Sequence, residues 1–158
     1  MKSLYRVFWW IMYTAGAVVV QQAVPGVDAL MPGFLLALQE KRPRQILVLF
    51  IAFTLIQEGA GSLNFGTAVL GYGGAVLFFR MSHGFFVEDN IVFVVMLSAC
   101  LGLYHGLLTW LMCAVQTVPV DFEQLVRESV IQTLIIPLIW GLAYFVRPKS
   151  TAAAAPRT

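Results

Sequence analysis

One ionisable side chain, His105, stands in the middle of a long apolar run at 91–118. An ionisable group at membrane depth is a candidate for a proton relay or for contact with a ligand. The alternative is a neutral imidazole that donates one hydrogen bond to a neighbouring helix. We expect no second histidine and no acidic residue at the same depth. The sequence therefore predicts neither a relay chain nor a metal site.

Small residues recur on two apolar runs. They are Gly66, Gly71 and Gly74 on the first run, and Ser98, Gly102 and Gly106 on the second. Such residues let another backbone approach closely, either inside the monomer or from a partner helix. We favour packing inside the monomer. A groove that holds a partner helix or a substrate is the alternative.

Other side chains give no pattern that is typical of catalysis. The sequence has no Ser-His-Asp set, no paired carboxylates at one depth and no Cys-x-x-Cys. An enzyme would need a nucleophile with an activating base. We therefore expect a protein that is not an enzyme and carries no cofactor. The few basic residues are dispersed in short breaks, which also argues against binding of nucleic acid.

The composition is that of a membrane protein. Of 158 residues, 59% are hydrophobic and 11% are charged, and a soluble chain of this size could not bury so much apolar surface. Six apolar runs are expected at about 4–24, 29–39, 45–57, 64–81, 91–118 and 128–146. The second and third are short for a bilayer crossing, and they either cross a thinned region or pack as a helical hairpin inside the protein. Pro32 and Pro137 predict kinks in the second and last runs.

These runs predict an all-α fold, a compact bundle of about six transmembrane helices with short loops. Residues 1–149 would form a single bundle, and 150–158 a disordered cytoplasmic tail. With six crossings and a cytoplasmic N-terminus, nine of the ten lysines and arginines face the cytoplasm, and Arg127 lies outside. This distribution follows the positive-inside rule, and Lys41, Arg42 and Arg44 would be its main cytoplasmic anchor. Both termini are then cytoplasmic.

One acidic residue, Glu58, ends the third run just before a glycine-rich turn. It is either a simple interfacial end, a cap for the next helix or a contact for a partner.

The stretch at 41–79 resembles the middle of the MreD family of bacterial rod-shape-determining membrane proteins. The resemblance rests on Pro32 in a short second helix, the basic turn Arg42-Pro43-Arg44, Glu58 before Gly61, and Gly66 followed by Gly71-Tyr72. The last run, with Pro137, is similar to the final helix of that family. The resemblance also implies a fold related to the substrate-binding membrane subunits of energy-coupling-factor vitamin transporters.

Membership of this family would imply a multi-pass scaffold in the bacterial inner membrane, part of the machinery that elongates the lateral peptidoglycan wall. Its partners would be an MreC-like bitopic protein, through it RodA and a class B penicillin-binding protein, cytoplasmic MreB, and membrane lipid. The alternatives are a subunit of a transporter that binds a vitamin-sized molecule, or an accessory anchor of another membrane complex. The transporter alternative predicts an internal cavity, open to the outside, with lining residues such as Gln57, Asn64, His105 and Gln132.

Overall fold

The computed structural model describes residues 2–24, 26–60, 66–82 and 90–147. Its helices are α1 (Lys2–Ala23), α2 (Met31–Gln39), α3 (Pro43–Ala60), α4 (Thr67–Ser82), α5 (Ile91–Val115) and α6 (Phe122–Val146). No strand occurs within these ranges, so the all-α prediction is confirmed. The expected tail at 150–158 lies outside the described residues.

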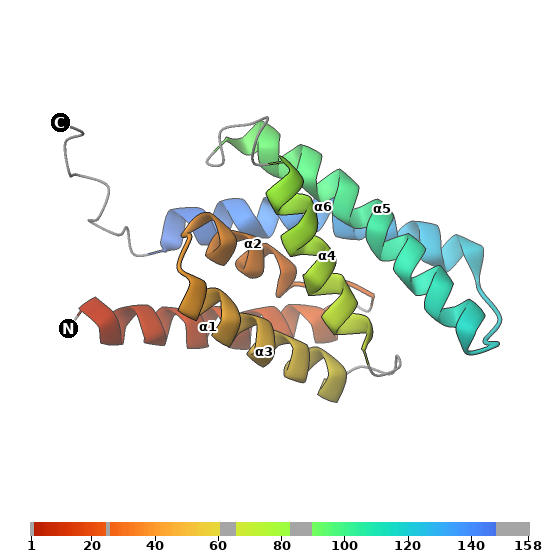
Figure 1. Cartoon of the computed structure of the whole chain (residues 1–158), viewed down its shortest axis with the longest axis horizontal. Helices are drawn as coiled ribbons and strands as arrows, with labels where there is room; N and C mark the ends of the chain where they lie inside the picture. Colours follow the sequence, from red (N-terminus) through yellow and green to blue (C-terminus); the bar gives the residue numbers. More distant parts are fainter. Residues whose placement is uncertain (1, 25, 61–65, 83–89, 148–158) are drawn as a thin grey trace.

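Successive helices run in alternate directions along the molecule (Figure 1). α1 begins where α6 ends, and we call this the basic end because cationic residues lie at or near the helix termini there. They are Lys41, Arg42, Arg44, Arg80 and Arg147. The opposite end, which we call the polar end, holds the last residues of α1, α3 and α5 and the first residues of α2, α4 and α6.

The short helix α2 forms the centre of the molecule. Every residue from Met31 to Leu38 is buried, and α2 contacts α3, α4 and α6. The Phe34 ring meets the buried Tyr72 ring of α4 edge-on, with 5.2 Å between the ring centroids. The expected kink at Pro32 is wrong, because Pro32 lies in the first turn of α2, where a missing backbone N–H leaves no helical hydrogen bond unmade. α2 is packed inside the protein, whereas α3, its partner in the expected buried hairpin, exposes Leu47, Val48 and Leu55 on the outer surface.

Helix α6 begins at Phe122 rather than near residue 128 as predicted. The Asp121 carboxylate caps it by accepting hydrogen bonds from the backbone N–H groups of Glu123 (3.0 Å) and Gln124 (3.2 Å). A capping side chain satisfies backbone donors that have no partner inside the helix. The polar stretch at 122–127, which precedes the apolar run expected at 128–146, therefore forms the first turns of α6, and the helix is continuous across Pro137.

The small residues of α5 face α6. A Cβ atom added at Gly102 would meet Thr133 Oγ1, and would lie 2.9 Å from the carbonyl oxygen of Ser129. A Cβ atom at Gly106 would meet Ser129 Oγ. Ser98 on the same stripe is fully buried. The stripe thus lets α5 and α6 approach closely inside the monomer, as small residues do between membrane helices.

Large apolar side chains cover much of the outer surface. Leu4, Leu103 and Phe145 are 78%, 76% and 83% exposed, and similar residues lie on every helix except α2. An apolar surface of this extent is rare on soluble monomers. Within the described residues, α5 and α6 are long and apolar enough to cross a membrane, with 25 residues each.

Candidate functional site

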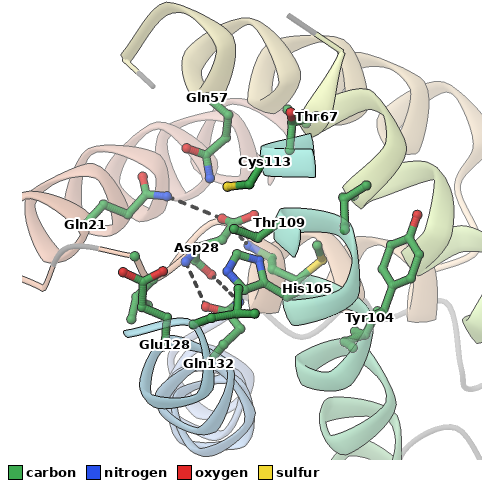
Figure 2. A pocket seen from close by; sticks show the side chains of 18 of the residues that line it. Gln21, Asp28, Gln57, Thr67, Tyr104, His105, Thr109, Cys113, Glu128 and Gln132 are labelled. Atoms are coloured by element: carbon green, nitrogen blue, oxygen red, sulfur yellow. Dashed lines mark hydrogen bonds between the residues drawn. The ribbon is translucent and has the colours of Figure 1, made fainter. Parts of the chain in front are cut away.

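A cavity of about 570 Å³ lies toward the polar end of the molecule, and Figure 2 shows side chains that line it. Residues of α1, α3, α4, α5 and α6 and of the connection at 24–30 line it. The polar lining residues include Gln21, Asp28, Gln57, Glu58, Thr67, Tyr72, Tyr104, His105, Thr109, Asp121, Gln124, Glu128 and Gln132. Apolar residues such as Val27, Leu101 and Leu108 complete the walls.

Asp28 is the residue around which the polar contacts gather. Its Oδ1 atom accepts hydrogen bonds from the backbone N–H groups of Leu30 (2.9 Å) and Met31 (3.1 Å). Since these donors lie at the start of α2, the carboxylate caps that helix. Oδ1 also accepts from the Tyr72 hydroxyl of α4 (3.2 Å) and the Gln21 amide of α1 (3.4 Å). One carboxylate therefore connects α1, α2 and α4.

Gln132 joins the same connection to α6. Its side-chain oxygen accepts from the Asp28 backbone N–H at 2.8 Å, and its Nε2 donates to the Asp28 carbonyl oxygen at 3.1 Å. Gln132 is 2% exposed, so these two bonds satisfy backbone groups that have little access to water. They fix the position of Asp28 relative to the last helix.

His105 lies beside Asp28 and Gln132, and Glu128 approaches from α6 (Figure 2). The carboxylates of Asp28 and Glu128 both act electrostatically on the imidazole. No hydrogen bond joins the ring to any residue in the described part of the chain. The expected hydrogen bond from His105 to a neighbouring helix is therefore not seen among these residues. The imidazole is left half-buried against the cavity.

The charges around the cavity are of one sign. The carboxylates of Asp28, Glu58, Asp121 and Glu128 line it, and no lysine or arginine does so among the described residues. The lysines and arginines within the described ranges lie at the basic end instead, apart from Arg127 near the start of α6. The molecule is therefore polarised along its length.

Glu58 has a structural role at this end of the molecule. Its two carboxylate oxygens each lie 2.9 Å from the Gly66 backbone nitrogen, and Oε1 also accepts from the Ala68 N–H at 3.0 Å. Glu58 thus caps the start of α4, one of the roles expected for it. Gly66 adopts a φ of +101°, a conformation that suits glycine.

We expect Glu58→Ala to lower the free energy of unfolding by about 0.5–2 kcal/mol, the usual effect of removing a helix cap. Thermal unfolding in mild detergent measures the change. Glu58→Gln is the matched control, because it keeps an oxygen acceptor for Gly66 and Ala68. Equal melting of Glu58→Ala and the wild type would show that α4 does not depend on this cap.

The other predicted residues separate into two groups. Gly71 and Glu58 line the cavity with His105, whereas Gly74, Ser98, Gly102 and Gly106 lie at or near helix contacts away from it. A Cβ atom at Gly74 would meet the Tyr104 ring. Lys41, Arg42 and Arg44 lie at the basic end, and Pro137 lies within α6. Asn64, expected in a cavity by the transporter alternative, is outside the described residues.

The structure also corrects the expectation about acidic residues near His105. Two acidic residues, Asp28 and Glu128, line the same cavity as His105, although none was expected at its depth. Asp28 was taken as part of a break between helices. The sequence does contain a pattern that could have identified Asp28. It is an acidic residue two positions before Leu30 and three before Met31, at the start of a short apolar helix with Pro32 in its first turn. That spacing is typical of a capping side chain.

Comparison with protein-family models, with curated proteins and with solved structures found no match to this chain.

Proposed function

We propose that this chain is a multi-pass subunit of the bacterial inner membrane with six passes and both termini in the cytoplasm. The observation that carries this proposal is the alternation of six helices, with the lysines and arginines of the described residues, except Arg127, gathered at one end. Cytoplasmic loops carry an excess of these residues. The exposed apolar side chains on the outer helices would face lipid.

We further propose that the protein is a non-enzymatic scaffold of the MreD type, which docks an MreC-like bitopic partner in the machinery for lateral wall elongation. The residues that carry the resemblance support the layout of such a subunit. Pro32 lies in the first turn of the central helix α2, the basic turn at 41–44 leads into α3, and Glu58 caps the start of α4. Through its partner, the protein would reach RodA, a penicillin-binding protein and MreB.

The partner helix would dock on an outer face, because α6 already covers Gly102 and Gly106. The outward face of α4 offers Gly73 between the exposed residues Val69 and Leu77. A Cβ atom at Gly73 would have no atom within 4 Å. A small residue between apolar ones allows another helix to approach closely.

Affinity purification from the host membrane in mild detergent tests this function. We expect an MreC-like bitopic protein to copurify with the wild type, and its recovery to fall at least about tenfold with Gly73→Leu. Gly141→Leu is the control, because it adds the same bulk on α6 where a Cβ atom also has open space. Purification without any MreC-like protein would contradict the scaffold function, and equal recovery with Gly73→Leu would exclude this face of α4.

A second function is favoured by the cavity itself. Gln57, His105 and Gln132 were the residues expected around the binding site of a transporter subunit, and they line one cavity at the polar end. In the proposed orientation this end faces outward. A cavity of about 570 Å³ with a few convergent polar groups is typical of a small-molecule site. Native mass spectrometry of the purified protein would detect a stoichiometric ligand if this function holds.

A further inference from the structure

We propose that the cavity binds a small molecule that carries a protonated amine on an apolar body, with Glu128 as the main partner of the amine. The inference rests on the second proposed function, the binding of a small molecule, and names the chemical class of the ligand. It does not depend on the docking of a bitopic partner.

The volume and the lining of the cavity set the size and the body of the ligand. A cavity of about 570 Å³ lies within the range of small-molecule sites. Leu101, Leu108 and the Tyr104 ring give it apolar walls on α5. A ligand with an aromatic or aliphatic body would remove this surface from water, which stabilises binding by about 25 cal/mol per Å² of apolar area.

The charge of the lining sets the charge of the ligand. Carboxylates line the cavity and the described lining residues include no lysine or arginine. A carboxylate or phosphate ligand would therefore enter a site of like charge in which no described lysine or arginine pairs with it. Like charges repel more strongly in a partly buried site than in water. A protonated amine is attracted by these carboxylates and can donate charge-assisted hydrogen bonds to them.

The existing contacts distinguish the two carboxylates nearest His105. Asp28 Oδ1 already accepts hydrogen bonds from four donors and holds α1, α2 and α4 together. Glu128 is half-buried, and its described hydrogen bond comes from the Gln124 amide at 2.7 Å. Its carboxylate therefore keeps more capacity to accept from a ligand. His105 also lines the cavity, on the other side of Asp28 from Glu128 in Figure 2, and no described residue forms a hydrogen bond with its imidazole.

Three probes with one indole body test the inference on the full chain in lipid nanodiscs. They are tryptamine, which is a cation at neutral pH, tryptophol, which is neutral, and indole-3-propionate, which is an anion. Isothermal titration calorimetry measures their affinities. We expect tryptamine to bind at least about tenfold more tightly than either of the others, since a charge-assisted hydrogen bond contributes more than a neutral one.

A pair of variants on α6 tests the role of Glu128. Glu128→Gln removes the charge and keeps a similar shape, and we expect it to lower the affinity for tryptamine at least about tenfold. Glu123→Gln is the matched control, because Glu123 lies in the first turn of the same helix and does not line the cavity. It should leave the affinity for tryptamine unchanged. Thermal unfolding of each variant verifies that the bundle is folded.

Several results would overturn the inference. Binding of indole-3-propionate or tryptophol as tight as that of tryptamine would contradict the amine preference. An unchanged affinity of Glu128→Gln for tryptamine would show that Glu128 does not bind the amine. No binding of any probe would overturn the ligand class as stated, while a different ligand retained in native mass spectrometry would leave the small-molecule function standing. None of these results bears on recovery of a bitopic partner.

Discussion

Replacing Gln132 with leucine is expected to lower the free energy of unfolding by about 2–4 kcal/mol. Gln132 is 2% exposed and makes two hydrogen bonds to the backbone of Asp28, at 2.8 and 3.1 Å. Leucine has nearly the same bulk but makes neither bond. The Asp28 N–H and carbonyl groups would then lie in the bundle without their partner. Each such group costs about 1–3 kcal/mol when it is buried and unsatisfied.

Thermal unfolding in mild detergent checks this result, with Gln124→Leu as the control. Gln124 is an exposed amide on the same helix, and its replacement should change the free energy of unfolding by no more than about 0.5 kcal/mol. If Gln132→Leu and Gln124→Leu melt alike, the connection at 24–30 is not held by α6. The polar centre of the cavity would then lack the support that we assign to it.

Gly102→Leu is expected to destabilise the bundle by about 1–3 kcal/mol, the usual effect of overpacking. The reason is the close approach of α5 and α6, where a Cβ atom at Gly102 already meets Thr133 Oγ1 and lies 2.9 Å from the Ser129 carbonyl oxygen. The Thr133 hydroxyl also donates to that carbonyl oxygen at 2.9 Å. A larger side chain must move the hydroxyl, the helix or both.

Two further variants make this prediction specific. Gly73→Leu adds the same bulk on the exposed face of α4, where a Cβ atom has no atom within 4 Å, and should not lower the melting temperature of the isolated protein. Thr133→Ala removes the nearest atom, so it should recover part of the loss in the milder variant Gly102→Ala. Coupling of this kind between two residues in contact is measured by a double-mutant cycle. Melting of Gly102→Leu at the wild-type temperature would mean that the stripe faces lipid.

The sequence predicts where the helices occur better than it predicts their exact boundaries or how deeply each is buried. Apolar runs and charged breaks located all six helices, because long apolar segments and basic turns are strong local signals. They did not locate the start of α6, since the turn that Asp121 caps is polar and precedes the apolar run at 128–146. They also did not show that α2 is buried on all sides, because the same apolar residues are expected whether a helix contacts lipid or protein.

The cavity could be anticipated only in part. His105 is visible as an ionisable residue in an apolar run, and Gln57 and Gln132 were expected around a binding site if one exists. Asp28 was missed because its partners are distant in the sequence, with Tyr72 44 positions away and Gln132 104 positions away. Local spacing carries no information about such contacts. A search for acidic residues in the capping position of short apolar helices would have selected it.

The shortness of α2 has a consequence for biogenesis in the proposed topology. Nine residues extend about 14 Å, roughly half the thickness of the hydrocarbon core. Such a segment is a weak signal for the insertion machinery, and it must enter the bilayer through its neighbours. Its last neighbour in the chain is α6, whose Trp140 indole donates to Gln39 at 2.8 Å. The nascent protein therefore holds its central helix without one of its partners until α6 has been synthesised, and this interval is when chaperones or membrane proteases would act on it.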